Sequence, residues 1–485
     1  MFMRSKIRIL PLVQVVIFIL GFFTDNYGPL ILTLLGCTIL MILDNLGKGI
    51  VLREIIALHS IFICLVMPLV GYNFFTKANA LAHLWVRWMP VPEDEYFGFA
   101  LPAITGFALV LCWPLNDRRI SDYGASLSRL LDAAKKIVQY KTRFGVILLG
   151  IGMVAFEAQN FMPEALRFAF LLFFFAGFAG FLYVYYSKNF KFRRVVIGIF
   201  VAFILAATVN SGMFTVVAYM GLTLFSFFFL GRKTRLWKKF LVFCVGGFLL
   251  VVIQMVKPAF RAKVWKEDYQ GSKAALFGSM FVEKVSNFSV ESADLFFPVY
   301  YRTNQGFNVA LVMRRFPSKH EFDYGSKVAV DIVSALVPRF LWPDKPEAGG
   351  KFNMKYYAGF TINGWSTNVG PLGEAYGSFG PVGGVFYMIL LAFFIRWAYR
   401  TLFRLAQKTP LLLFWIPVLF YQVTYSAETD TLQIMNSILK AAFFVWLLYK
   451  IKPDLFKILT APQPRKGAQR RPGTVGEGAM ATGHH

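Results

Sequence analysis

Of the 485 residues, 57% are apolar and only 16% are charged, whereas soluble globular domains average about 25% charged. This balance excludes a soluble globular protein, and apolar blocks near 20 residues long exclude a β-barrel, whose strands would be short and alternating. In a soluble protein, a net charge of +25 would indicate nucleic-acid binding. Most Lys and Arg here lie in short loops between apolar blocks, so we expect no nucleic-acid partner.

About twelve apolar segments are long enough, or nearly so, to cross a lipid bilayer as helices. They are residues 9–23, 29–44, 55–75, 96–114, 144–161, 165–187, 195–211, 213–230, 240–256, 378–398, 410–427 and 431–449. We therefore predict an all-α, polytopic membrane protein with nine spans in residues 1–256 and three in 378–450. Because no small-residue cleavage site follows the first segment, we expect it to be a span rather than a signal peptide.

The charges between these segments predict the orientation of the chain. Alternate connections are rich in Lys and Arg, while the others are nearly free of them. Since cytoplasmic loops carry the excess of basic residues, we expect both termini in the cytoplasm and residues 257–377 outside, as one large extracytoplasmic loop. The basic tail, residues 451–485, is rich in Pro and Gly, and we expect it to be disordered.

One inner connection carries an amphipathic pattern near residues 126–138. Leu127, Leu130, Leu131, Ala134 and Val138 recur at helical spacing, with basic residues beside them. A helix of this kind is typical of a membrane surface. We therefore expect a cytoplasmic helix lying on anionic lipid.

Polar residues inside the apolar segments indicate where a site could form, because each is costly in hydrocarbon. In the predicted topology the following lie in the outer third of the membrane: Glu157, Gln159, Arg167, Gln254, Lys257, Gln422, Glu428 and Asp430. Together they predict a shared outer cavity. The alternative for each residue taken singly is a position at a helix end, in contact with the lipid headgroups. Lys440 lies near the middle of the last span, and we expect it to be paired or to line a cavity.

The outer loop combines arginines with many aromatic residues. Arg302, Arg314 and Arg315 suit bidentate contact with phosphate, and aromatic faces suit the C–H faces of a sugar. A sugar on a lipid pyrophosphate would fit both, whereas the alternative for most of the aromatics is an ordinary loop core. The four cysteines all lie in apolar runs without a paired spacing, so we expect neither a disulfide framework nor a cysteine-based metal site.

Two stretches of this loop have distinctive sequence patterns. Residues 327–337 predict a helix against the membrane, followed by the rigid run Pro338-Arg-Phe-Leu-Trp-Pro-Asp-Lys-Pro346. The prolines of that run hold the backbone of Arg339 and Lys345 rigid. These residues could bind a ligand, or one of them could form a structural salt bridge to Asp344. The glycines between 373 and 384 predict close helix packing, with Glu374 and Tyr376 at the outer end of the tenth span.

His320 is a candidate general base. It stands in Lys319-His-Glu-Phe-Asp-Tyr-Gly325, where Glu321 or Asp323 could orient the ring. The alternative is a solvated loop histidine.

These motifs resemble those of the Wzy-type O-antigen and exopolysaccharide repeat-unit polymerases of bacteria. The resemblance rests on residues 338–346, on the Gly-Glu-Ala-Tyr-x-x-Phe-Gly-x-x-Gly pattern at 373–383, on Arg302 and on Tyr324-Gly325. It implies a GT-C-like fold in the bacterial inner membrane and inverting, metal-independent glycosyl transfer without a nucleotide sugar or other cofactor. The growing glycan would move from undecaprenyl pyrophosphate to a new lipid-linked repeat unit, with a chain-length regulator and a flippase as possible partners.

The resemblance also implies roles for the loop residues. Some family members use an Arg-x10-Gly spacing, which Arg314 to Gly325 and Arg339 to Gly350 satisfy. By this analogy the catalytic candidates are Arg339, Glu374 and His320. Candidates for pyrophosphate binding are Arg302, Arg314, Arg315 and Lys345, and candidates for sugar binding are Trp342 and Tyr376. Two alternatives stay open: an O-antigen ligase that transfers glycan to lipid A–core, and a polysaccharide flippase or transporter.

Overall fold

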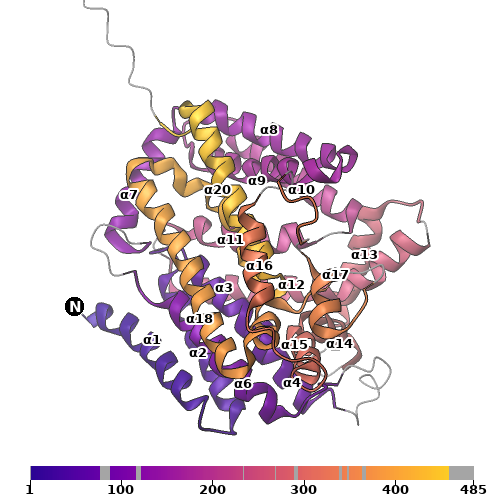
Figure 1. Ribbon diagram of the computed structural model, residues 1–485. Helices are drawn as coiled ribbons and strands as arrows, with labels where there is room; N and C mark the ends of the chain where they lie inside the picture. Colours follow the sequence, from indigo (N-terminus) through magenta and orange to yellow (C-terminus); the bar gives the residue numbers. More distant parts are fainter. Residues whose placement is uncertain are drawn as a thin grey trace, which may run out of the picture.

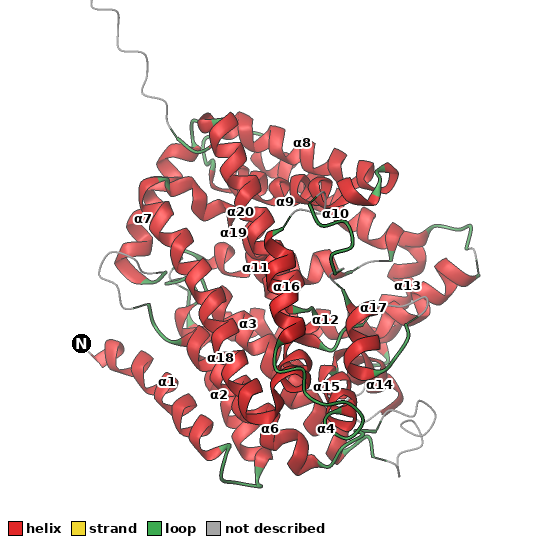
Figure 2. Cartoon of the chain, viewed as in Figure 1, coloured by secondary structure: helices red, strands yellow, loops and turns green. Residues whose placement is uncertain are grey.

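The computed structural model describes residues 2–76, 88–115, 122–212, 214–232, 234–267, 269–288, 293–337, 341–346, 349–362 and 367–457. Within these ranges the chain is helical and contains no β-strand, only isolated bridges of Gly49 with Leu46 and Tyr123. Figure 2 shows helices throughout. The predicted all-α class is therefore confirmed.

The first nine predicted spans are all helical. The elements are α1 (Phe2–Leu20), α2 (Tyr27–Asn45), α3 (Leu52–Ile61), η1 (Phe62–Val66), α4 (Met67–Asn73), α6 (Glu93–Cys112), α7 (Gly124–Val138), α8 (Thr142–Ala158), η2 (Gln159–Phe161), α9 (Glu164–Tyr186), α10 (Arg193–Ser211), α11 (Thr215–Phe229), α12 (Leu236–Arg261) and η3 (Ala262–Lys266). The η1 segment is a π-helical turn inside the third span.

The segment predicted as the outer loop is largely helical too. It contains α13 (Lys273–Ser286), α14 (Ala293–Thr303), α15 (Gln305–Arg315), α16 (Ser326–Leu336), α17 (Gly350–Asn353) and η4 (Met354–Ala358). The chain then continues with α18 (Gly370–Lys408), η5 (Pro410–Trp415), α19 (Ile416–Thr424), η6 (Ser426–Glu428), α20 (Thr431–Ile451) and η7 (Pro453–Leu455). The flanking helices α12 and α18 extend past the predicted loop limits at 257 and 377.

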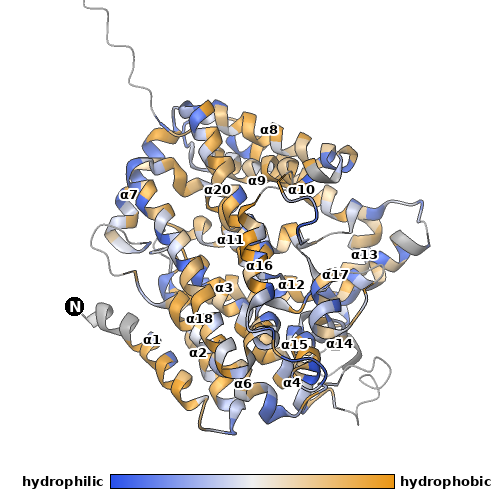
Figure 3. Ribbon diagram, viewed as in Figure 1, coloured by the Kyte–Doolittle hydropathy of each residue, from blue (hydrophilic) through white to orange (hydrophobic). Residues whose placement is uncertain are grey.

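Ten helices of the described chain are long and apolar enough to cross a membrane. Two further apolar helices, Ile9–Leu20 and Thr215–Phe229, coincide with predicted spans but are shorter. Figure 3 shows apolar residues over most of the helices, with hydrophilic ones gathered on α7 and on the segments around α14 and α15. This is the pattern of a multi-pass membrane protein.

The helix predicted near 126–138 is present as α7, but its apolar face does not lie on lipid. Leu127, Leu130, Leu131, Ala134 and Val138 are all buried, and α7 packs against η5 and α9. The helical spacing of these apolar residues correctly predicted the helix. The expectation of a lipid-facing helix is wrong, because η5 and α9 cover the same stripe that lipid would have covered.

Close glycine contacts hold the helices together. A Cβ atom at Gly152 of α8 would lie 2.8 Å from the Cα atom of Gly177 on α9. One at Gly384 of α18 would lie 2.8 Å from the ring of Phe99 on α6. Small residues allow such close approach in membrane helices, so the glycine-rich stretch in 373–384 packs as predicted.

The long helix α18 is broken at Gly380. This residue has φ 68° and ψ −172°, a region that is essentially restricted to glycine, and Pro381 follows it. The break separates an N-terminal arm, residues 370–379, from the long membrane section that follows. In Figure 1, α18 runs down one side of the molecule, and α16 lies beside α20 near its centre.

Candidate functional site

A polar cavity of about 460 Å³ lies between the C-terminal helices and the segment that precedes α18. Its lining comes from α9, α11, α14, α15, α19, η6, α20 and the stretches before α17 and α18. The lining residues are Phe168, Thr215, Arg302, Gln305, Gly349, Gly350, Thr367, Asn368, Gln422, Tyr425, Glu428, Thr429, Gln433, Asn436 and Lys440. Ligand pockets commonly measure about 300–1,000 Å³, so this cavity has the size of a binding site.

The lining confirms part of the prediction from polar residues inside the spans. Gln422, Glu428 and Lys440 all line the cavity, and Asp430 lies directly beside it. The other five predicted residues do not line it: Glu157, Gln159, Arg167, Gln254 and Lys257. A shared cavity therefore exists, but it is built around α19 and α20 rather than by every polar residue at that depth.

An ion pair forms one wall of the cavity. Nη2 of Arg302 lies 2.9 Å from Oε2 of Glu428, and the Tyr219 hydroxyl donates to Oε1 of Glu428 at 2.5 Å. Nε2 of His59 is 3.4 Å from the same Oε1. The Glu428 carboxylate raises the pKa of Arg302 above its ordinary value, so Arg302 stays charged. Its side chain is 43% exposed, against 13% for Glu428, so the guanidinium is the accessible partner.

Local sequence explains how these two residues meet. Arg302 lies in the last turn of α14, and Asn304 then starts α15 by accepting a hydrogen bond from the Phe307 N–H at 3.2 Å. Glu428 closes η6, the short turn between α19 and α20. Two helix junctions therefore meet at one wall of the cavity.

Asp430 fixes the far side of that turn. Its Oδ1 accepts from the Gln433 N–H at 2.6 Å, which caps α20. Its Oδ2 accepts from the Gly349 N–H and from Nδ2 of Asn368, both at 2.8 Å. Burial raises the pKa of Asp430, and these hydrogen bonds oppose that shift. The residue holds two stretches of the 257–377 segment against the membrane helices.

Glu374 is a buried anchor rather than a lining residue. It is 0% exposed. Its Oε1 accepts from Nδ2 of Asn353 at 2.9 Å, and its Oε2 accepts from the Thr431 N–H at 2.9 Å and the Thr431 hydroxyl at 2.6 Å. The carboxylate ties α17, the arm of α18 and α20 together. This geometry gives it no access to a substrate hydroxyl.

The other predicted catalytic residues lie apart from the cavity lining or outside the described residues. His320 is exposed beyond α15, and its Nε2 lies 2.5 Å from Nη2 of Arg315. Asp323 accepts instead from the Tyr356 hydroxyl at 3.1 Å. Arg339 lies outside the described residues, so its predicted role stays a prediction.

The remaining binding candidates have other neighbours. Arg314 is exposed at the end of α15. Lys345 donates to the carbonyls of Ser334 and Val337 at 2.8 and 2.7 Å and so caps the C-terminus of α16. Trp342 is half-buried, while Tyr376 is 6% exposed and packs edge-on against Phe99. Of the candidates for pyrophosphate or sugar binding, Arg302 is the one in the described lining.

Sequence reasoning misses His59 and Tyr219, which hold the Glu428 carboxylate. A histidine inside an apolar span was the available signal, since a polar group there is costly without a partner. Tyr219 carried no signal, because tyrosines are frequent in this chain.

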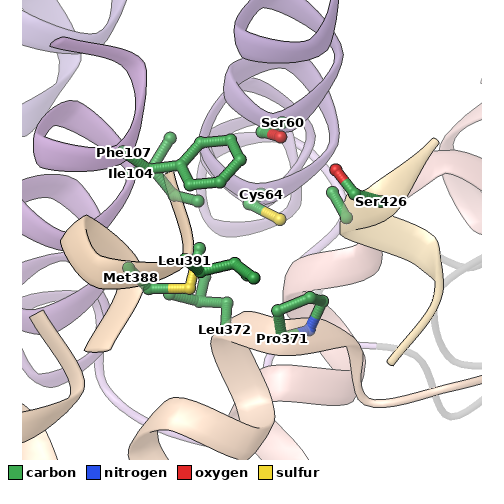
Figure 4. A pocket seen from close by; sticks show the side chains of 10 residues that line it. Ser60, Cys64, Ile104, Phe107, Pro371, Leu372, Met388, Leu391 and Ser426 are labelled. Atoms are coloured by element: carbon green, nitrogen blue, oxygen red, sulfur yellow. The ribbon is translucent and has the colours of Figure 1, made fainter. Parts of the chain in front are cut away.

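A second, much smaller cavity lies deeper, between α3, η1, α6, α18 and η6. It measures about 10 Å³, close to the lower limit for one water molecule. Figure 4 shows Ser60, Cys64 and Ser426 on one side and the apolar side chains of Leu372, Met388 and Leu391 among the rest. It is too small to bind a ligand and is a packing void.

Comparison with known proteins places the chain in a family. Residues 127–402 match a family described as a domain of unknown function (DUF8712). No curated protein and no solved structure matches the chain. The matched region contains Arg302 and ends before Glu428 and Lys440, so the cavity is lined from inside and outside it. Because the match covers more than half of the 485 residues, this chain belongs to the DUF8712 family.

Proposed function

We propose that this protein is a membrane-embedded, inverting glycosyltransferase of GT-C-like architecture that polymerises lipid-linked oligosaccharide repeat units. The donor is a growing glycan on undecaprenyl pyrophosphate, and the acceptor is a new repeat unit on the same carrier. The observation that carries this proposal is the polar cavity of about 460 Å³ among apolar helices, with the accessible guanidinium of Arg302 in its wall. The pyrophosphate headgroup of a lipid carrier is anionic, and a guanidinium beside the bilayer is suited to bind it.

Arg302 is suited to stabilise the leaving group. In the transfer the bond from the anomeric carbon to the pyrophosphate oxygen breaks, and a bond from the acceptor oxygen to that carbon forms. Negative charge builds up on the pyrophosphate, and a preoriented guanidinium is most effective where charge develops. Glu428 holds Arg302 in place before the substrate arrives.

The proton of the acceptor hydroxyl needs a base. Among the described lining residues, Glu428 carries the one carboxylate. When the pyrophosphate shares the charge of the preoriented Arg302, Glu428 loses part of its ion pair and can accept that proton. This assigns to Glu428 the role that the sequence suggested for Glu374 or His320, because Glu374 is fully buried and His320 lies outside the lining.

A transporter of lipid-linked glycans is the second candidate, and a specific feature favours it. Transporters form their sites from interrupted membrane helices. Interruptions of the described membrane helices include the π-helical turn Phe62–Val66, the break at Gly380, and the 3-10 turns Pro410–Trp415 and Ser426–Glu428 around α19.

Deletion of the gene, followed by analysis of surface and carrier-linked glycan, separates these functions. Loss of a polymerase leaves a single repeat unit on the anchor. Loss of a ligase leaves long chains on undecaprenyl pyrophosphate, and loss of a transporter leaves no glycan outside the inner membrane. Either of the last two results, or unchanged glycan length, contradicts the proposed polymerase.

A further inference from the structure

The C-terminal part of α12 carries a polar face. Gln254, Lys257 and Arg261 follow one another at spacings of three and four residues, which places them on one side of the helix. α12 packs against α14, whose last turn carries Arg302. Nε of Arg261 donates to the carbonyl of Gly212 at 2.8 Å, at the connection between α10 and α11. The polar face of α12 therefore lies beside helices that build the wall of the cavity.

Lys257 is a buried cation on this face, with 7% exposure. It forms no hydrogen bond or ion pair with any residue that the structure describes. The charged groups that act on it electrostatically are Arg261, Arg302 and Glu428. Two of these are cations as well, so Glu428 is the one described carboxylate that can balance Lys257.

Glu428 is thus shared between two cations. Its Oε2 lies 2.9 Å from Nη2 of Arg302, and its side chain is only 13% exposed. The same carboxylate is the opposite charge closest in effect to Lys257. One carboxylate cannot fully neutralise both Arg302 and Lys257, and an anion bound at Arg302 would restore the balance.

A pyrophosphate at Arg302 would also change what Glu428 needs. The ligand shares the charge of the guanidinium, and a buried carboxylate that loses its counter-charge is strongly destabilised. Lys257 supplies a replacement cation for Glu428. In the bound state the charges then divide into two pairs, Arg302 with the pyrophosphate and Lys257 with Glu428. Lys257 does not line the cavity, so this contribution requires no contact with the ligand.

We propose that Lys257 is a positioning residue of the anion site: it serves as the counter-ion of Glu428 while a pyrophosphate is bound at Arg302, and so raises the affinity for pyrophosphate without touching it. The identity of the anion rests on the proposed function, whereas the shared carboxylate is a feature of the structure alone. In glycosyl transfer Lys257 would also keep Glu428 ionised, which is the form that can accept a proton.

Binding of farnesyl pyrophosphate to the full-length protein in nanodiscs tests this role without requiring glycosyl transfer. Farnesol is the uncharged comparison ligand. We expect Lys257→Met, which removes the charge and keeps an unbranched side chain, to weaken farnesyl pyrophosphate binding about tenfold and to leave farnesol binding unchanged. Lys257→Arg should bind farnesyl pyrophosphate nearly as tightly as the wild type.

Lys263→Met is the matched control for the loss of one positive charge. Lys263 lies on η3, directly after α12, and is exposed. It is not among the charges that act on Lys257, so its replacement should leave both affinities unchanged. An equal loss in Lys257→Met and Lys263→Met would indicate a general effect of positive charge and would contradict the proposal.

The Glu428→Gln background separates a counter-ion from a direct ligand. Without the carboxylate, Lys257 has no charge to neutralise, so the addition of Lys257→Met should change the affinity less than about threefold. An equal tenfold loss in both backgrounds would mean that Lys257 attracts the ligand itself, and the counter-ion role would be wrong. If Glu428→Gln does not fold, Arg302→Gln provides the same comparison, because Glu428 then keeps Lys257 as its partner with or without ligand.

Three further results would overturn the proposal. They are wild-type affinity in Lys257→Met, an equal loss of farnesol binding in that variant, and a loss in Lys257→Arg as large as in Lys257→Met. The second would point to a structural role, and the third to the shape of the lysine rather than to its charge.

This proposal and the proposed function fail on different results. An affinity that depends jointly on Lys257 and Glu428, in a protein whose deletion leaves glycan length unchanged, would refute the polymerase and keep the counter-ion role. A single-repeat phenotype with an affinity independent of Lys257 would do the reverse. Failure of the wild type to bind farnesyl pyrophosphate would refute the counter-ion role, and the deletion phenotype would still decide the polymerase.

Discussion

Arg302 and Glu428 neutralise each other at the wall of the cavity, yet only the guanidinium is well exposed. An arginine held in this way is oriented for an incoming anion before the anion arrives. Removal of a preoriented group that stabilises developing charge typically lowers the rate about 10²–10³-fold. The pair is therefore the first place to test the chemistry.

If the proposed glycosyl transfer is correct, we expect Arg302→Gln to reduce glycan polymerisation by about 10²–10³-fold, because the pyrophosphate leaving group would lose its counter-charge. The measurement is the length distribution of glycan made by purified protein from lipid-linked repeat units. Arg167→Gln is a suitable control, since Arg167 is exposed and does not line the cavity. Equal chain lengths in wild type and Arg302→Gln would remove Arg302 from the mechanism.

Lys327 and Asp331 form a buried ion pair one turn apart on α16. Nζ of Lys327 lies 2.5 Å from Oδ2 of Asp331, and the two side chains are 9% and 2% exposed. Lys327→Met would leave Asp331 buried without its counter-charge. We expect a loss of about 3–5 kcal/mol of stability, measured as a lower midpoint of thermal unfolding in detergent.

The double variant Lys327→Met/Asp331→Leu provides the control for this pair. Replacing both charges by apolar groups should restore most of the stability, because a buried ion pair gains little over packed apolar side chains. If both variants are equally unstable, Lys327 contributes through its cation–π contacts with Phe352 and Tyr357 rather than through its ion pair with Asp331.

At the level of elements, the break in α18 decides where the site forms. The arm before Gly380 carries Glu374, whose three hydrogen bonds hold α17 and the start of α20. A continuous helix through Gly380 would carry this arm in another direction. The shape of the cavity wall therefore depends on one glycine conformation and on the proline that follows it.

Gly380→Ala should lower stability by about 1–3 kcal/mol, the usual strain of a side chain in a backbone region reserved for glycine. Its added Cβ would also lie 3.3 Å from the ring of Phe322. The thermal midpoint in detergent measures this effect. Gly246→Ala on α12 has no heavy atom within 4 Å of the new Cβ and should leave the midpoint nearly unchanged; an equal drop in both variants would refute the argument.

For the whole molecule, the orientation in the membrane rests on the charge pattern of the loops. Cysteine labelling of intact cells tests it, in a background with Cys37, Cys64, Cys112 and Cys244 replaced by Ala. We expect a membrane-impermeant maleimide to label Lys319→Cys, which is exposed beyond α15 on the predicted outer side. Asn189→Cys, exposed on the predicted inner side, should react only after the membrane is permeabilised. The reverse pattern would invert the topology and place the cavity opposite the predicted face.

Local patterns were sufficient for much of the fold. Every predicted apolar segment is helical, and the helices predicted at 126–138 and 327–337 correspond to Gly124–Val138 and Ser326–Leu336. The glycines of 373–384 allow the close packing that their spacing indicated. The prediction that α7 faces lipid was wrong, because the sequence pattern of an amphipathic helix is the same whether lipid or protein covers its apolar face.

The sequence by itself determined that this is a multi-pass helical protein, because apolar length and helical periodicity are properties of neighbouring residues. It also singled out Arg302, Gln422, Glu428 and Lys440 as polar residues whose positions called for a structural or functional explanation. Only the tertiary structure decided that these four share one cavity, that His59 and Tyr219 hold Glu428, and that Glu374 is an anchor. Several of those relations join residues more than a hundred positions apart, such as Arg302 with Glu428 and Tyr219 with Glu428. Contacts at that range follow from how helices pack, which no local pattern of residues encodes.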